Sequence, residues 1–311
     1  MKKLQINLWL SRKSFFLLLL LCLTETLPAR AATFVTFPDE WDIGQAFVVA
    51  LSSHASFESA SVTWLDQVVS LDVEPGREGF VSYALLGSYV RDVKPGSYPM
   101  EFCFTQDGER FRVKCTIQLN AKKYPEERLK VEEKMVTPPK SEATRIKKEA
   151  QLAANARKMM TLKRLWTTPP TRPVPGIFTS SYGFRRIYNG VPRGYHAGTD
   201  FRAAVGTPIK APFAGTVVLT GHHYYAGQSV YIDSGNGVIS LFFHMSKINV
   251  KEGDFVAKGQ VIGQSGATGR ITGPHLHFGL SLAGQYVDAA PLFETSVTNL
   301  LKKMKTEIVR P

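Results

Sequence analysis

The chain has 311 residues, 44% of them hydrophobic and 21% charged, which is ordinary for a globular protein and long enough for two domains with sizeable cores. Its formal net charge of +12 favours anionic cell-envelope polymers or lipid surfaces as partners. The sequence contains neither a nucleic-acid-binding module nor a basic stripe with interleaved aromatic residues. It therefore argues against a nucleic-acid partner.

Residues 1–31 show the three regions of a secretory signal peptide. Basic residues precede an apolar run from Phe15 to Leu23, and a small-residue site with Ala29 and Ala31 follows. A membrane anchor is the weaker alternative because the apolar run is shorter than the ~20 residues that span a bilayer. We therefore expect cleavage after Ala31 and an exported protein without a transmembrane anchor, located in the periplasm or cell envelope or secreted.

Residues 32–120 are predicted to form a small β-sandwich. Short runs rich in β-branched and aromatic residues are separated by turn signals at Glu74-Pro75-Gly76, Lys94-Pro95-Gly96 and Asp107-Gly108. In an exported protein, Cys103 and Cys115 on either side of the last turn could form a disulfide. A tight two-residue loop would instead place them on opposite faces of the sheet. The sequence leaves both arrangements open.

Residues 121–175 are predicted to be a charged, helical linker. One amphipathic helix is expected after Ser141, a candidate N-cap, and the proline-rich stretch TTPPTRPVPG ends it. The basic face of this helix could bind a partner, but a solvated face on a connector is the simpler interpretation. Residues 294–311 are expected to be a basic tail with a short helix.

Residues 176–293 lack helical periodicity and are rich in glycine and β-branched runs. This pattern predicts a compact antiparallel β-domain with glycine-rich corners, so the fold class of the whole protein is expected to be all-β.

Six of the seven histidines lie from His196 to His277, within this predicted β-domain. In the sequence TGPHLHF, His275 and His277 point to the same face of a strand because side chains alternate, while Leu276 points to the opposite face. Two adjacent imidazoles should not both be charged, and a shared cation removes that conflict. Two exposed histidines on a strand are the alternative interpretation.

His196 and Asp200 form an HxxxD pair that could bind zinc if a bend or bulge turns both side chains inward. His244 follows an apolar run in SLFFHMS, where a histidine without a role would be misplaced. His196, Asp200 and one histidine of the HxH pair supply three ligands, the number that a catalytic zinc retains. The remaining histidine of the pair and His244 could then serve as base and oxyanion donor. Spacing alone does not decide which HxH histidine binds the metal.

Several motifs in one order resemble the lysostaphin-type, or LytM-like, zinc endopeptidases, which cleave peptide bonds of bacterial peptidoglycan. The similarity covers about residues 176–293 and rests on HAGTD, GTPIKAPFAGTV, FFHMS, VKEGDFVAKGQVIGQSGATGR and TGPHLHFGL. The resemblance implies a LytM-like peptidase domain with one Zn²⁺ ion, bound by His196, Asp200 and His277. It also implies that His275 is the general base and that His244 helps to hold the oxyanion.

The sequence departs from the family pattern at two positions that are not metal ligands. Phe242 replaces a common tyrosine, and Ser234 stands where a histidine is often found. His222 and His223 match no required position and are expected in a surface loop. Arg185 and Arg186 could contact a substrate carboxylate by bidentate hydrogen bonding.

These observations predict an exported zinc endopeptidase that hydrolyses cross-links between peptidoglycan stem peptides. The first alternative is a catalytically idle or autoinhibited cell-wall-binding regulator of another hydrolase. The second is a carrier domain, because the GDFVAKGQ hairpin also resembles lipoyl-type barrels. The sequence does not identify the cross-link, which could be a glycine bridge or a D-alanyl bond to a diamino acid. It identifies neither protein partners nor the oligomeric state.

Overall fold

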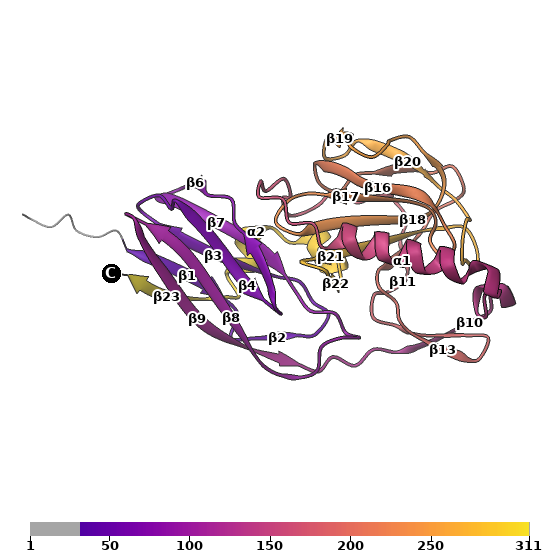
Figure 1. Cartoon of the computed structure of the whole chain (residues 1–311), viewed down its shortest axis with the longest axis horizontal. Helices are drawn as coiled ribbons and strands as arrows, with labels where there is room; N and C mark the ends of the chain where they lie inside the picture. The colour runs from indigo at the N-terminus through magenta and orange to yellow at the C-terminus, as the bar shows by residue number, and fades with distance from the viewer. Residues whose placement is uncertain (1–31, 311) are drawn as a thin grey trace, which may run out of the picture. The chain divides into compact units, whose positions relative to one another are not determined.

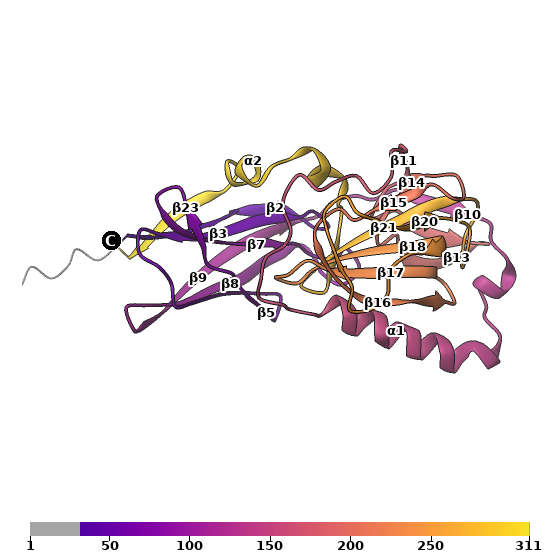
Figure 2. The same cartoon turned by 90° about the horizontal axis from the view of Figure 1, so that it is seen from above.

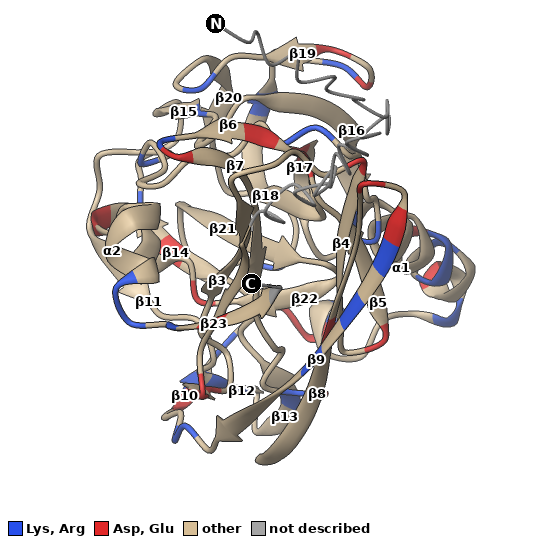
Figure 3. Cartoon of the chain, turned by 90° about the vertical axis from the view of Figure 1, so that its left-hand side faces the viewer, with Lys and Arg blue, Asp and Glu red and all other residues tan. Residues whose placement is uncertain are grey.

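Strands dominate the computed structural model, which describes residues 32–310, and the predicted all-β fold class is confirmed (Figure 1). The predicted signal peptide, residues 1–31, lies outside the described residues. Within residues 32–310, no helix combines the length and the apolar character needed to cross a bilayer. Lys, Arg, Asp and Glu are intermixed along the strands and α1 in the view of Figure 3.

Two five-stranded sheets pack face to face in the N-terminal part of the chain. The first sheet contains β1 (Thr33–Phe37), β3 (Phe47–Ser53), β6 (Glu74–Gly76), β7 (Gly79–Leu86) and β23 (Lys305–Arg310). The second contains β2 (Glu40–Asp42), β4 (Ser59–Trp64), β5 (Gln67–Ser70), β8 (Gly96–Gln106) and β9 (Glu109–Asn120). Alternating apolar side chains from both sheets meet in the core, where the rings of Phe47 and Trp64 lie 5.5 Å apart. Glu74-Pro75-Gly76, expected to be a turn, instead forms the edge strand β6.

Cys103 and Cys115 are free, and the register of β8 and β9 explains why. Asp107 and Gly108 form a two-residue loop with positive φ angles of 54° and 74°. In the resulting register Cys103 lies opposite Arg112, whereas Cys115 lies opposite Met100 and is buried. The thiols therefore point to opposite faces of the sheet, and burial raises the pKa of the Cys115 thiol to about 12.

A ten-stranded antiparallel sheet forms the second part of the fold. Its main path runs in the order β11-β14-β21-β18-β17-β16-β19, and three short strands are attached to it. The strands are β11 (Phe178–Ser180), β14 (Thr199–Arg202), β15 (Pro208–Lys210), β16 (Gly215–His223), β17 (Gly227–Asp233), β18 (Val238–Ile248), β19 (Phe255–Val256), β20 (Val261–Ser265), β21 (His275–Leu282) and β22 (Gln285–Val287). The long central strands β18 and β21 carry the residues around which the site is built.

The segment between the two parts is more ordered than a charged linker would suggest. Its strand β10 (Glu126–Leu129) pairs in parallel with β12 (Arg185–Tyr188), and β13 (Val191–Tyr195) completes a three-stranded sheet. The 3-10 turns η1 (Glu133–Met135) and η2 (Lys140–Glu142) then lead into helix α1 (Ala143–Arg157). Ser141 does not cap α1, because it lies within η2, and Glu142 occupies the cap position without a side-chain hydrogen bond.

Helix α1 lies along β16 and β18 rather than standing free in solvent (Figures 1 and 2). Ala153 and Ala156 pack on apolar side chains of the sheet, and Arg145 donates a hydrogen bond to the carbonyl of His222. Its other face is solvated, as expected for a connector.

The C-terminal residues return to the N-terminal sheet. After η3 (Ala290–Glu294) and α2 (Val297–Leu301), strand β23 pairs with β1. The expected short helix is present as α2, but the strand that follows it was not expected.

Candidate functional site

The HxH pair lies at the start of β21, opposite β14. Asp200 on β14 is the direct cross-strand neighbour of His277, which brings the carboxylate and the imidazole together. Leu276 is fully buried in the core on the opposite face, whereas His275 and His277 both line a pocket. The strand alternation predicted from TGPHLHF is therefore present in the structure.

His196 reaches the same point from the break between β13 and β14. Its Nδ1 lies 2.8 Å from the carbonyl oxygen of Ser181. Since a carbonyl only accepts, this contact places the ring proton on Nδ1 and leaves Nε2 as a lone pair. His196 Nε2 lies 3.0 Å from Asp200 Oδ1 and 2.9 Å from His277 Nδ1. His277 Nδ1 is 2.9 Å from the same carboxylate oxygen.

These three side chains fit a metal ion by the chemistry of their donor atoms. They are the group among residues 32–310 whose ligand atoms lie close enough to share a cation, all within 4.8 Å of one another, and all three are buried. The lone pair of His196 faces a carboxylate oxygen and a second imidazole nitrogen, so the cluster lacks positive charge at its centre. Two imidazoles and one carboxylate are a ligand set that zinc accepts, with a further position open.

Electrostatics keep His277 and Asp200 in the protonation states that metal binding requires. Burial lowers the pKa of His277 to about 4, although the hydrogen bond to Asp200 acts in the opposite direction. Burial alone would raise the pKa of Asp200, but the nearby His196 and His277 outweigh burial and hold it well below its usual value. His277 is therefore neutral and Asp200 ionised at neutral pH.

Arg186 holds the second oxygen of Asp200. Its guanidinium lies 3.0 Å from Asp200 Oδ2 and 2.8 Å from Glu127 Oε2, and its side chain is buried. The carboxylate of Asp200 thus presents one oxygen to the histidines and the other to Arg186. Arg186 is consequently not available for a substrate carboxylate, although the sequence had suggested that role for it. Arg185 is exposed and pairs with Glu126 outside the pocket.

A β-bulge places His244 beside the other histidines. Gln228 and Val230 of β17 pair with Met245 and Phe242 of β18. One residue lies between the two on β17 but two lie between them on β18, so β18 contains one extra residue. His244 takes a left-handed backbone conformation, with φ of 61°, and its side chain enters the pocket. Its ring lies 4.9 Å from that of His275. Burial, together with the charge of neighbouring histidines, lowers the pKa of His244 to about 3.

His244 and His275 share the orientation seen in His196. The Nδ1 of His244 lies 2.7 Å from the carbonyl oxygen of Thr268, and the Nδ1 of His275 lies 2.8 Å from that of Gly273. In the neutral rings, each Nε2 is therefore unprotonated. His275 Nε2 is 3.6 Å from Asp200 Oδ1, so the base candidate lies next to the metal-binding cluster.

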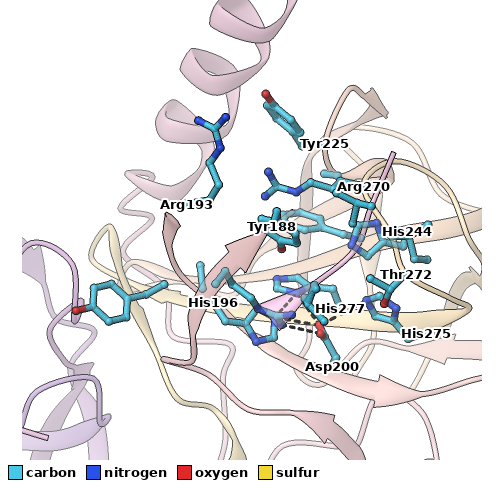
Figure 4. A pocket seen from close by; sticks show the side chains of 18 residues that line it. Tyr188, Arg193, His196, Asp200, Tyr225, His244, Arg270, Thr272, His275 and His277 are labelled. Carbon is cyan, nitrogen blue, oxygen red and sulfur yellow. Dashed lines mark hydrogen bonds and ion pairs between the residues drawn. The ribbon is translucent and has the colours of Figure 1, made fainter. Parts of the chain in front are cut away.

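All five predicted site residues line one cavity of about 210 Å³ (Figure 4). The cavity wall also contains residues that the sequence did not indicate: Leu129, Val131, Tyr188, Arg193, Tyr225 and Arg270. Phe242 and Ser234 do not line the cavity, so the departures from the family pattern do not alter its wall. His222 and His223 do not line it either, and His223 is buried at the end of β16 rather than in a surface loop.

Comparisons with known proteins agree with this geometry. Residues 194–289 match peptidase family M23. The peptidoglycan DD-endopeptidase ShyA of Vibrio cholerae is 40% identical over 132 residues, which are 42% of this chain and 31% of ShyA. Lysostaphin of Staphylococcus staphylolyticus is 42% identical over 103 residues, which are 32% of this chain and 22% of lysostaphin.

A solved structure described as a peptidase M23 from Pseudomonas aeruginosa is similar over more of the chain. It matches with a TM-score of 0.60 and 29% identity, over 79% of this chain and 92% of that one. The matches to the curated relatives named above cover about a third or less of those proteins' length. The chain therefore contains a peptidase M23 domain of the LytM/lysostaphin type, which residues 194–289 match.

Proposed function

We propose that the protein is an exported zinc-dependent endopeptidase that hydrolyses peptide cross-links of peptidoglycan. The observation that carries the proposal is the convergence of His196, Asp200 and His277 next to two further histidines in one cavity. The similarity to ShyA, a peptidoglycan DD-endopeptidase, supports the reaction class. The basic composition and the signal-peptide pattern support an anionic substrate in the cell envelope.

His196, Asp200 and His277 would hold a single zinc ion. When bound, zinc would polarise the scissile carbonyl and lower the pKa of a water molecule at the site. Arg186 would keep Asp200 from rotating, because it fixes the carboxylate oxygen that faces away from the histidines.

His275 would act as the general base. Its Nε2 is unprotonated in the neutral ring and faces the metal-binding cluster, so it can take a proton from the attacking water. The same nitrogen can then give this proton to the leaving amine. The contact of Nδ1 with the carbonyl of Gly273 keeps the ring in place during both transfers.

His244 would help to stabilise the oxyanion, but only after it has gained a proton. Its Nδ1 already donates to Thr268, so Nε2 donates to an oxyanion only in the cationic ring. We therefore propose that the single proton released by the water passes from His275 to His244 Nε2 while the carbonyl is tetrahedral, and that it returns through His275 to the leaving amine.

Zinc content and muropeptide release, measured on the same samples, test this function. H196A and D200A are expected to lose both zinc and the digestion of purified sacculi. H275A should retain zinc but lose roughly 10²–10⁴-fold in rate, the usual contribution of a general base. H222A, which changes an exposed histidine outside the cavity, is the matched control and should behave as the wild type.

Two outcomes would contradict the proposal in different ways. Digestion of sacculi by H196A or D200A would remove the metal site from the reaction. A zinc-loaded wild-type protein that binds sacculi but releases no fragments would instead support the idle, regulatory alternative.

A further inference from the structure

Arg270 lies in the wall of the cavity between two tyrosine rings (Figure 4). Its guanidinium carbon is 4.4 Å from the centre of the Tyr188 ring and 4.7 Å from the centre of the Tyr225 ring. The planar cation is thus held between two aromatic faces, and each face attracts it. Tyr188 comes from β12, Tyr225 from the turn before β17, and Arg270 from the loop before β21, so three separate segments build this arrangement.

The backbone around Arg270 is fixed as closely as the side chain. The amide of Arg270 donates to the carbonyl of Tyr225 over 2.8 Å. Gly269 has a positive φ of 77°, and a Cβ there would lie 2.4 Å from the nitrogen of Gly227 and 2.5 Å from the oxygen of Tyr225. Only glycine allows the two loops to approach this closely. Arg270 is therefore preorganised rather than free to search for a partner.

The N–H edge of Arg270 remains available for a ligand. Within residues 32–310, no ion pair or side-chain hydrogen bond engages its guanidinium, in contrast to Arg186, which is paired with Asp200 and Glu127. Tyrosine faces occupy the two flat sides of the cation but accept none of its in-plane hydrogen bonds. A planar, anionic acceptor matches that edge, and a carboxylate does so in a bidentate manner.

The charge of the cavity wall favours the same ligand class. Among its described lining residues, Asp200 is the one carboxylate, and the arginines are Arg186, Arg193 and Arg270. Arg186 is paired with both Asp200 and Glu127, and Arg193 donates to the backbone carbonyl of Val136. Among the described residues, Arg193 and Arg270 are thus the arginines of the cavity wall without a carboxylate partner, and their positive charge attracts an anionic group on the peptide.

We infer that Arg270, held between Tyr188 and Tyr225, is a specificity residue that binds a free carboxylate of the peptide next to the scissile bond. This inference rests on the proposed endopeptidase function and extends it to the choice of substrate. A cross-link to a diamino dicarboxylic acid carries such a carboxylate, whereas a glycine bridge or a cross-link to lysine does not. The protein should accordingly prefer stem peptides cross-linked through a diamino dicarboxylic acid whose second carboxylate is free.

Two synthetic cross-linked peptides that differ only at this group test the inference. In one, the diamino acid carries a free carboxylate, and in the other a carboxamide. The zinc-loaded full chain should cleave the carboxylate peptide with a kcat/KM roughly tenfold or more above that of the amidated peptide, as expected for one charge-assisted bidentate contact. In R270Q this ratio should fall to about one. R270K retains the charge without the planar fork and should give an intermediate ratio.

R185Q is the matched control, because Arg185 is an exposed arginine that pairs with Glu126 outside the cavity. It should keep the wild-type ratio. Circular dichroism and zinc content identify any variant that fails to fold, in which case the R270K ratio decides. A wild-type ratio near one, or an unchanged ratio in folded R270Q, overturns the inference while the proposed function stands.

A binding measurement separates failure of the inference from failure of the proposed function. Calorimetry with the same two peptides, made with a non-hydrolysable link at the scissile position, reports recognition without turnover. If the wild type cleaves neither peptide but binds the carboxylate form more tightly, and R270Q loses this preference, then the inference stands and the proposed reaction is wrong. Equal binding of both forms by the wild type overturns the inference directly.

Discussion

At the scale of single residues, one glycine leaves the space that the imidazole ring of His277 occupies. Gly198 lies between His196 and Asp200, and its Cα faces the ring of His277. A Cβ at this position would lie 2.6 Å from His277 Nε2 and 2.4 Å from the backbone oxygen of Phe278. The backbone oxygen belongs to the central strand β21 and cannot move aside, so the imidazole would have to shift.

G198A is therefore expected to weaken zinc binding although it replaces none of the proposed ligands. Displacing one ligand ring should lower the zinc affinity roughly 10–100-fold, the effect usually seen when the support of a ligand is lost. Competition with a fluorescent zinc chelator measures this affinity. G273A is the matched control, because a Cβ at Gly273 meets nothing within 4 Å although the residue is close to His275. Equal affinities in both variants would show that the ring of His277 does not need this space.

The sequence predicted which side chains meet, but it did not predict how they are held. Strand alternation alone places His275 and His277 on one face, and the structure agrees. The role of Arg186 depends on a partner from the segment before α1, and that of Arg270 depends on two rings distant in the chain. Such contacts leave no local pattern, so neither the pairing of Arg186 with Asp200 nor the position of Arg270 could be predicted from the sequence.

At the scale of elements, residues 129–136, from the end of β10 to just after η1, run along the cavity. We call this segment the strap. Leu129 and Val131 line the cavity. Asn189, in the turn between β12 and β13, accepts from the amide of Val131 over 3.0 Å and donates to its carbonyl over 2.9 Å. Tyr224 and Arg193 donate to two further carbonyls of the strap. Side chains thus replace the strand pairing that ends with β10.

N189G should loosen the strap while leaving the turn intact. Asn189 has a positive φ of 49°, which glycine adopts without strain, so the substitution removes only the side-chain hydrogen bonds. At about 1 kcal/mol each, their loss should increase local opening roughly tenfold or more. Trypsin cleavage at Lys130 and Lys134, followed by mass spectrometry, measures this opening.

N299A serves as the comparison for the strap experiment. Asn299 is exposed on α2, and no described residue hydrogen-bonds with its side chain. Its cleavage rates at Lys130 and Lys134 should equal those of the wild type. If N189G is cut no faster than N299A, the hydrogen bonds of Asn189 do not hold the strap closed.

The elements most visible in the sequence were those with a strong local pattern. The hairpin at Asp107-Gly108 and the helix after Ser141 follow from turn chemistry and helical spacing, although the predicted cap of α1 was wrong by one residue. Strand β10 was not predicted because Glu126–Leu129 is short, charged and without alternation. β10 forms because the edge of β12 provides backbone groups with which it pairs. This depends on β12 and not on the sequence of β10.

At the scale of the whole molecule, the two ends of the described chain meet in one sheet. Strand β23 pairs with β1, and β1 pairs with β3, so the C-terminal strand covers an edge of the sandwich (Figure 1). The sequence KTEIVR contains too few apolar residues to predict a strand that pairs with the sandwich. Its pairing partner lies more than two hundred residues earlier, which a local pattern cannot reveal.

Two substitutions on neighbouring residues of β23 test whether this edge stabilises the protein. Val309 is partly buried and packs against the core of the sandwich, whereas Ile308 is 65% exposed on the opposite face. V309D places a charge against apolar side chains and should lower the melting temperature by roughly 5–10 °C, because burial of an unpaired charge costs several kcal/mol. I308D introduces the same charge into the same strand at a solvated position, so its melting temperature should remain within about 2 °C of the wild type. Thermal unfolding followed by circular dichroism distinguishes the two.

Identical melting of V309D and the wild type would mean that β23 contributes no packing to the sandwich, whereas equal destabilisation by both variants would point to a charge effect on the strand as a whole.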